Sequence, residues 1–519
     1  MTLPRTSGHL LALLVLALVL TGCNADSRSS ASSSPSAPAS STTSAPGPAG
    51  PVPAGLRTYY GQRLDWKPCR SGDQCARLRV PLDYAHPGGR SIRVGLLKAP
   101  AAKPGERLGS MVFDPGGPGA SGVDYVGSGA ATAFGSALRD HYDIIGLDPR
   151  GVGTSTEVNC LPDKQLNAVL AGDPDPETTT EIVRSDALLR GFGQGCVKES
   201  GAVAAHVSTV EVAKDLDVLR GALGEREMTY FGASYGTAIG STYADLFPKN
   251  VGRMVLDGAI DPTSSTLEIN RVQAQGFETA LRSYVRSCVD KGDCFLGSSV
   301  DQGTLRVKRF LDQVAANPLP AGSGRRLDLA NASYGISYPL YDKAGWPVLT
   351  TALQRAFGGD GTVLMLLADG YLHRTATDTY KDNTFEAFYA VNCLDHDDAV
   401  KSSQLKKYDA MFDKASPTFG RTFLYSATAC QDWPVHTGRG PQRVHATGAA
   451  PILVIGTTRD PATPLVWAKS LAKQLDNAVL ITRDGDGHTG YRQGSPCVDG
   501  AVESYLVRGT VPSPNLRCS

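Results

Sequence analysis

The residues with the strongest chemical signature are a serine, an aspartate and a histidine that occur in that order along the chain. Ser234 stands in Gly232-Ala-Ser-Tyr-Gly236, a G-x-S-x-G pattern that follows an apolar β-type run and precedes a helical pattern. This context is typical of a nucleophile on a tight strand-to-helix turn, where flanking glycines leave room for the bend. The pattern predicts that Ser234 is a nucleophile with a strained backbone.

A serine hydroxyl needs a base, itself oriented by an acid, to attack at neutral pH. Asp460 follows the buried-strand pattern at 451–456, and His488 is the last histidine of the chain, just after a β-type run at 478–481. The order serine, acid, histidine is the one expected for a G-x-S-x-G turn. We therefore predict Ser234, Asp460 and His488 as a catalytic triad.

Other roles remain open for these side chains. Asp460 could cap a turn or helix, and His488 could be a surface-turn residue. Asp257 and Asp261, which follow the sixth β-type run, compete for the role of the acid. Asp460 is preferred because it stands where the carboxyl edge of a strand would gather catalytic loops. We also expect Thr463 to hydrogen-bond to its carboxylate.

The oxyanion of an acyl-transfer reaction needs two preorganised donors. One is expected to be the amide of Tyr235, directly after the nucleophile, and the other should lie in the glycine-rich loop at 113–122. Gly117 is the predicted second donor, because a glycine there lets the backbone approach the substrate.

The same loop contains a G-x-G-x-x-G pattern at 117–122, which could indicate a dinucleotide site with Asp143 or Asp148 on the ribose. Pro118 stiffens the turn, and this interpretation leaves the serine, the acid and the histidine unexplained. The export that the N-terminal segment indicates, as described below, would also leave the protein little NAD to bind. A hydrolase is therefore the preferred interpretation, and no cofactor or metal is expected.

Short β-type runs alternate with helical patterns, which is typical of a mainly parallel sheet flanked by helices. The predicted strands lie at 76–82, 91–97, 110–113, 142–147, 228–231, 253–256, 451–455 and 478–481. Mostly helical patterns interrupt this alternation, which predicts a cap inserted into the core. We expect an α/β-hydrolase fold with core halves at 56–262 and 449–519 and a largely helical cap or lid at 263–448.

The N-terminal segment indicates export. Residues 1–22 contain Arg5 and an apolar run at 10–20, which is too short for a membrane-spanning helix and is typical of a signal peptide. Leu20-Thr-Gly-Cys23 resembles a bacterial lipobox, which implies lipidation of Cys23; an ordinary secretory signal is the alternative. Residues 23–55, rich in Ser, Ala and Pro, predict a flexible linker. We expect a protein anchored to the outer face of the cell membrane, or released outside the cell.

Charge and cysteine content argue against a nucleic-acid-binding protein and in favour of a disulfide-bonded one. Lys and Arg together number 51, as do Asp and Glu, so no overall positive field would attract a nucleic acid. Ten of the eleven cysteines remain after Cys23, and an even number in an exported chain favours disulfides. Proximity in the sequence suggests these pairs: Cys69 with Cys75, Cys160 with Cys196, Cys288 with Cys294, Cys393 with Cys430, and Cys497 with Cys518.

With these motifs in hand, the chain resembles the secreted tripeptidyl aminopeptidases and their proline-iminopeptidase relatives. The likeness extends from about residue 64 to the end, through Pro115-Gly-Gly-Pro-Gly119, Gly146-Leu-Asp-Pro-Arg-Gly-Val-Gly-Thr-Ser155, Gly232-Ala-Ser-Tyr-Gly236, Asp460-Pro-Ala-Thr-Pro464 and Gly487-His488. The resemblance implies a monomer without a cofactor, in which a C-terminal part supplies the acid and the histidine. It also implies a serine exopeptidase that frees short peptides from the amino terminus of peptide or protein substrates.

Two features depart from the family pattern or need an assignment. Relatives often carry His or Asn where this chain has Asp114. An exopeptidase must also hold the free amine of its substrate, and Asn392 and Asp395 are the candidates. The alternative is that these residues belong to a purely structural loop that a disulfide at Cys393 holds in place. A cell-envelope esterase or lipase with the same triad, or a binding protein on an inactive scaffold, are the alternative functions.

Overall fold

The computed structural model describes residues 52–53, 55–70 and 72–519. The predicted signal peptide, Cys23 and nearly all of the predicted linker lie outside the described residues. In the described part, no helix is long and apolar enough to cross a membrane.

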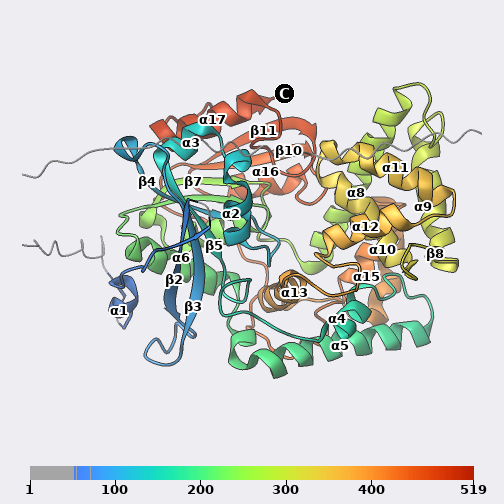
Figure 1. The fold of residues 1–519 in the computed structure, drawn as a ribbon, viewed down its shortest axis with the longest axis horizontal. Helices are drawn as coiled ribbons and strands as arrows, with labels where there is room; N and C mark the ends of the chain where they lie inside the picture. The colour runs from blue at the N-terminus through green and yellow to red at the C-terminus, as the bar shows by residue number, and fades with distance from the viewer. Residues whose placement is uncertain (1–51, 54, 71) are drawn as a thin grey trace, which may run out of the picture. The chain divides into compact units, whose positions relative to one another are not determined.

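A ten-stranded sheet forms the centre of the fold (Figure 1), in the order β1-β2-β3-β5-β4-β6-β7-β10-β11-β12. The strands are β1 Lys67–Arg70, β2 Asp73–Pro81, β3 Ser91–Ala99, β4 Gly109–Asp114, β5 Tyr142–Asp148, β6 Met228–Ala233, β7 Val251–Asp257, β10 Ile452–Arg459, β11 Ala478–Asp486 and β12 Leu516–Cys518. The pairs from β1 to β5 are antiparallel and those from β5 to β12 are parallel. The predicted mainly parallel sheet is confirmed, and each predicted strand forms.

Helices cover both faces of this sheet because each presents an apolar stripe to it. α2 (Gly122–Ala133), α3 (Ser136–His141) and α17 (Pro496–Arg508) lie on one face, where Val126, Leu138 and Val502 are buried together. α6 (Thr209–Ala222), α7 (Gly236–Leu246) and α16 (Leu465–Gln474) lie on the other, with Leu216, Ile239 and Leu471 in the core.

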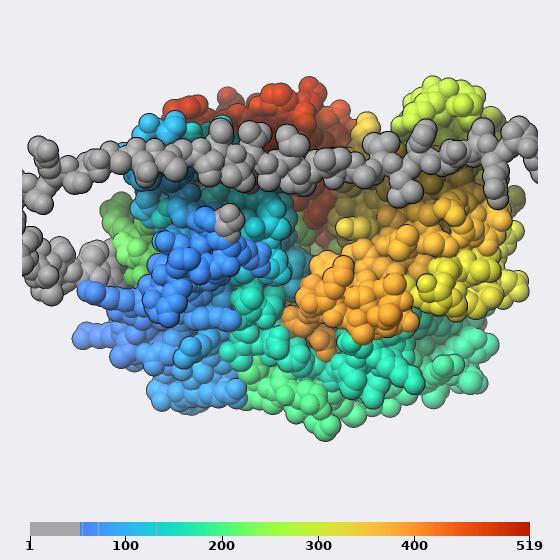
Figure 2. All heavy atoms as spheres, in the orientation of Figure 1, coloured from blue at the N-terminus to red at the C-terminus, as the bar shows by residue number. Residues whose placement is uncertain are grey.

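The predicted helical insertion forms a second compact layer with its own apolar core (Figure 1). Its helices are α8 Thr266–Val289, α9 Val300–Ala316, α10 Leu329–Ser337, α11 Trp346–Phe357, α12 Thr362–Tyr371, α13 Thr384–Asp395, α14 Asp409–Ala415 and α15 Gly420–Ser426, with the short pair β8 Leu319–Pro320 and β9 Arg326–Leu327. The side chains of Ser265 and Ser299 cap α8 and α9 by accepting backbone hydrogen bonds. Figure 2 shows these yellow and orange residues beside the blue and teal residues of the core.

A second excursion, between β5 and α6, also packs against the insertion. It contains α4 (Asp163–Leu170) and α5 (Thr179–Ser200), which run below α13 in Figure 1. Ion pairs join it to the insertion, from Arg421 to Asp175 at 2.9 Å and from Arg190 to Asp432 at 2.9 Å. In space the cap therefore combines the insertion with a segment that the sequence analysis assigned to the first core half.

Five disulfides link the described cysteines. Their partners are those that proximity suggested: Cys69–Cys75, Cys160–Cys196, Cys288–Cys294, Cys393–Cys430 and Cys497–Cys518. Disulfides of this number persist in oxidising compartments, so the chain is an exported protein.

Candidate active site

Ser234 lies at the turn that joins β6 to α7. Its φ is 55°, in the left-handed region that a non-glycine residue adopts only where its surroundings impose it. Its backbone amide donates to the Asp257 carbonyl at 2.9 Å, and the Thr237 hydroxyl donates to the Ser234 carbonyl at 2.6 Å. Bonds on both sides thus hold the strained turn, and the serine side chain is only half-buried.

The flanking glycines are required because backbone segments touch at this turn. A Cβ on Gly232 would lie 2.3 Å from the Gly236 carbonyl oxygen, and a Cβ on Gly236 would lie 2.6 Å from the Asp114 carbonyl oxygen. Both distances are far below van der Waals contact. The G-x-S-x-G pattern is therefore a steric requirement of the turn.

Asp460 and His488 form a buried pair beyond the ends of β10 and β11. His488 Nδ1 lies 2.9 Å from Asp460 Oδ1 and 3.0 Å from Oδ2. The Asp460 carboxylate also accepts from the amides of Ala462, Thr463 and Thr489 and, at 3.0 Å, from the Thr463 hydroxyl. Its side chain is 0% exposed, so these donors take the place of water.

The surroundings of His488 favour a strong base. Burial alone would lower its pKa, but the charge of Asp460 and the hydrogen bond to it act in the opposite direction, so the pKa of His488 is raised above its ordinary value. The bond through Nδ1 leaves Nε2 to take a proton. The His488 amide donates to the Tyr341 carbonyl at 2.7 Å, and the Tyr341 ring packs edge-on against the imidazole.

His488 and Ser234 meet at the end of β7. The Ser234 amide is bonded to the Asp257 carbonyl, and a Cβ on the next residue, Gly258, would lie 3.4 Å from His488 Cε1. Among the described residues no hydrogen bond joins the Ser234 hydroxyl to His488; such bonds are often long in enzymes without substrate. The three predicted triad residues therefore gather at one edge of the sheet.

The two rival acids have other partners. Asp257 accepts from the amides of Gly490 and Tyr491, so it orients the loop that follows His488. Asp261 accepts from Thr263 and from the Gln474 amide. Of the three candidate acids, Asp460 alone bonds to His488 among the described residues.

The glycine-rich loop that carries Gly117 approaches the turn that carries Tyr235. A Cβ on Gly116 would lie 2.7 Å from the Tyr235 amide nitrogen and 3.0 Å from Ser234 Cβ. The glycine-rich loop thus lies directly against the nucleophile turn. Within the described part of the chain, the amides of Tyr235 and Gly117 donate to no protein acceptor, so both are free for a substrate oxygen.

The cap touches each loop of the site. Gly276 on α8 packs against the backbone after Asp460, Tyr341 holds the His488 loop, and Gly119 packs against the start of α13. These contacts join residues far apart in the sequence, so no local pattern could have revealed them. The cap therefore contacts the loops that carry Ser234, Asp460 and His488 or lie beside them.

Both predicted amine-binding residues already have hydrogen-bond partners within the protein. Both oxygens of Asp395 accept from Thr209, one from its amide at 2.9 Å and one from its hydroxyl, and that hydroxyl also contacts the phenol of Tyr235. The Asn392 amide donates to the Phe388 carbonyl within α13. Asp395 therefore ties α13 to α6 and to the residue after the nucleophile, and a role for either residue in binding an amine stays a prediction.

A cavity of about 360 Å³ opens beside the nucleophile turn. Aromatic side chains line one part of it and polar ones, such as Ser128 and Gln493, another. It is bordered by Ala233, Asp257 and Thr489, which neighbour the triad residues in the sequence or in space. The aromatic members are Phe113, Tyr125, Phe134, Phe231 and Tyr491. The cavity therefore lies next to the nucleophile turn, although none of the three triad residues lines it.

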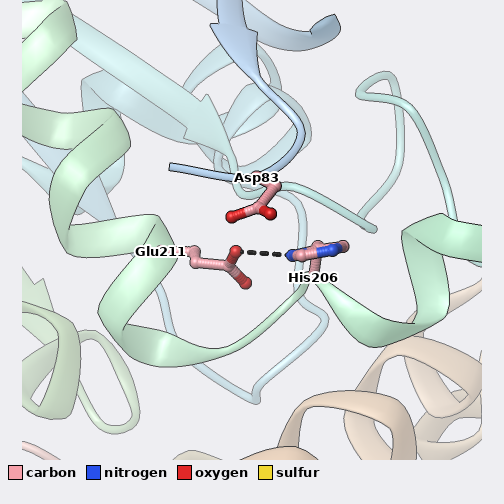
Figure 3. Close-up of side chains that lie close together, drawn as sticks. All are labelled: Asp83, His206 and Glu211. Atoms are coloured by element: carbon pink, nitrogen blue, oxygen red, sulfur yellow. Dashed lines mark hydrogen bonds and ion pairs between the residues drawn. The ribbon is translucent and has the colours of Figure 1, made fainter. Parts of the chain in front are cut away.

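Outside the site, Asp83, His206 and Glu211 form a cluster of metal-ligand types (Figure 3), with ligand atoms within 4.8 Å of one another. His206 Nδ1 already bonds to Glu211 at 2.8 Å. The Arg150 guanidinium lies 3.6 Å from the same Glu211 oxygen, and its positive charge disfavours a cation there. We interpret the cluster as part of the ion-pair network around Arg150.

Comparison with known proteins places the chain in a family. Serine protease Hip1 of Mycobacterium tuberculosis is 34% identical over 480 residues, which cover 88% of this chain and 91% of the relative. Carboxylesterase B of the same species is 35% identical and covers 86% of each chain. The tripeptidyl aminopeptidase of Streptomyces coelicolor is 29% identical and covers 88% of this chain and 86% of its own.

A family model described as TAP-like protein matches residues 416–518, the part that supplies Asp460 and His488. The resemblance to tripeptidyl aminopeptidases that the motifs indicated is thus confirmed. The chain belongs to the family of serine protease Hip1 and contains a TAP-like region at 416–518.

Proposed function

We propose that the protein is an exported serine peptidase that cleaves peptide bonds near a free N-terminus and releases tripeptides or other short peptides. The observation that carries this proposal is the Asp460–His488 pair, held at the edge of the sheet where the strained Ser234 turn also ends. Relatives named serine protease and tripeptidyl aminopeptidase support peptide or protein substrates.

The proposed reaction is acyl transfer through a covalent intermediate. His488 Nε2 takes the proton of Ser234 Oγ as this oxygen attacks the scissile carbonyl, while Asp460 stabilises the imidazolium through Nδ1. The amides of Tyr235 and Gly117 stabilise the oxyanion, and His488 then protonates the leaving amine. Water attacks the acyl-enzyme with the same base, so no cofactor is needed.

We further propose that Cys23 carries a lipid and that residues 23–55 tether a monomeric catalytic part to the outer face of the cell membrane. The lipobox pattern supports the anchor. The disulfides, which form outside the reducing cytoplasm, support the location.

An esterase acting on cell-envelope esters is the second candidate, because the relative named carboxylesterase B is as similar as Hip1. The triad geometry serves ester and amide alike. The two functions differ in whether a free substrate amine is required.

The test is hydrolysis of a matched set of chromogenic substrates by the wild type and by Ser234→Ala. The set contains free-amine mono-, di- and tripeptide amides, an N-blocked tripeptide amide and a short-chain ester. We expect turnover of the free-amine tripeptide, loss of turnover when its amine is blocked, and no turnover in the mutant. Turnover of the ester alone would make the protein an esterase.

A further inference from the structure

Asp114 is a buried carboxyl at the start of the oxyanion loop. It ends β4 and is 1% exposed. Its Oδ1 accepts a hydrogen bond from the Gly116 amide at 2.9 Å. In the described part of the chain, its Oδ2 is buried without any hydrogen-bond partner. A charged carboxylate with one donor and no cation would be strongly destabilised there.

The same residue touches both halves of the proposed oxyanion hole. Through Gly116 it is bonded to the loop that carries Gly117. On the other side, a Cβ on Gly236 would lie 3.1 Å from Asp114 Oδ1, so the carboxyl packs against the turn that carries Tyr235. Asp114 therefore contacts the residue next to each predicted donor, Gly116 beside Gly117 and Gly236 beside Tyr235.

No cation among the described residues offsets a charge at this point. The titratable groups that face Asp114 are Asp148 at the end of β5, Tyr230 on β6 and Tyr235 before α7. Burial raises the pKa of Asp114 to about 8; the Gly116 bond opposes this shift, and the charge of Asp148 adds to it.

We propose that Asp114 is a positioning residue that acts as a neutral acid: its uncharged carboxyl holds Gly116, and thereby Gly117, opposite the Tyr235 amide. A neutral carboxyl accepts the Gly116 bond without placing a charge beside the oxyanion. Ionisation would leave the loop in place but repel the developing negative charge. Protonated aspartate has the shape of asparagine, so Asp114→Asn mimics the active form at every pH.

The inference rests on the proposed serine-hydrolase mechanism, and its test avoids the substrate amine. The α-amino group of a peptide titrates near 8 and would hide the effect. We would therefore measure the rate at which a neutral fluorophosphonate labels Ser234, from about pH 6 to about pH 10. Tyr230 and Tyr235 do not titrate in this range, because burial raises their pKa values well above 10.

The wild-type rate is expected to fall above about pH 8, by up to about tenfold per pH unit. Asp114→Asn, compared with its own rate at neutral pH, should show no such fall. Asp114→Ala should react more slowly than Asp114→Asn at neutral pH, because it offers Gly116 no acceptor. Asp245→Asn, an exposed carboxylate on α7 that bonds to the His445 amide, is the matched control and should keep the wild-type fall.

An equal alkaline fall in Asp114→Asn, or a wild-type rate that stays level up to pH 10, overturns the inference. A level wild-type profile overturns the inference even if the variants fail to fold. Absence of labelling at every pH instead overturns the serine-hydrolase proposal on which this inference depends.

Discussion

The two sides of the candidate site contain buried aspartates in opposite surroundings. On the histidine side, Asp460 accepts hydrogen bonds from three backbone amides, the Thr463 hydroxyl and His488. On the oxyanion side, Asp114 accepts one, from Gly116. Burial is almost complete in both cases. The number of donors, and not the depth of burial, therefore separates a carboxyl that supports a cation from one that stays neutral.

The local sequence explains the difference. Both aspartates precede a proline, which has no amide hydrogen to donate. After Pro461, the next two amides turn back to the Asp460 carboxylate. After Pro115, Gly116 bonds to Asp114, but the following amide, of Gly117, stays free. The donor that Asp114 lacks is the one that we assign to the substrate oxyanion.

The largest expected effect on kcat comes from removing the carboxylate that bonds to His488. Asp460→Asn removes the charge that stabilises the His488 imidazolium and favours the wrong tautomer. We expect kcat for the free-amine tripeptide amide to fall by about 10⁴-fold. Asp261→Asn, whose carboxylate bonds to Thr263 and Gln474, should keep kcat near the wild-type value. Equal losses in both variants would contradict the assignment of the acid.

Removing one of the groups that donate hydrogen bonds to Asp460 should lower kcat by a smaller factor. Thr463→Val deletes the hydroxyl that lies 3.0 Å from Asp460 Oδ2 and 3.2 Å from His488 Nδ1, while keeping the shape of the side chain. A bond to a charged group contributes about 1.5–3 kcal/mol, so kcat should fall by about 10-fold to 100-fold. Thr463→Ser keeps a hydroxyl and should retain most of the activity. Equal kcat values for the two variants would remove Thr463 from the mechanism.

The acid limb of the pH profile measures the influence of Asp460 on His488. The base must be neutral, and its pKa is raised above 6.5. Plots of kcat/KM should therefore bend at a pH above 6.5 and fall by about tenfold per pH unit below it. Loss of activity that begins only near pH 4 would indicate a carboxylate base instead.

Short-range patterns predicted much of this site. The G-x-S-x-G turn and the order of Ser234, Asp460 and His488 depend on contacts between neighbours in the sequence or on the regular succession of strands and loops. The parallel sheet could be predicted for the same reason, because buried strands carry apolar runs bounded by turn residues. Proximity in the sequence also indicated the five disulfide pairs that the structure contains.

Long-range contacts could not be predicted in the same way. The orphaned oxygen of Asp114 becomes visible only when the neighbouring strands and α7 are in place. The bond from His488 to Tyr341 and the contact of Asp395 with Thr209 join segments more than 140 residues apart, and their residue types have many other uses. The packing of α5 against the cap likewise depends on long-range contacts, such as those of Phe192 with Tyr389 and Trp433, that leave no local pattern.

The last expected effect is a change in stability of only about a degree or two in Tm per pH unit, and it sharpens the comparison without any chemistry. The pKa of Asp114 is about 8 in the folded protein and near 3.8 in an ordinary carboxyl. At any pH between these two values the unfolded chain carries an ionised Asp114, so the wild type must take up a proton when it folds. Its stability should fall by about 1.4 kcal/mol per pH unit across that window, and Asp114→Asn lacks this loss. In a chain of this size, the Tm of Asp114→Asn relative to that of the wild type should rise by about 1–2 °C per pH unit and level off above pH 8. A constant Tm difference from pH 5 to 8 would mean that Asp114 is ionised in the folded protein, and the contrast with Asp460 would disappear.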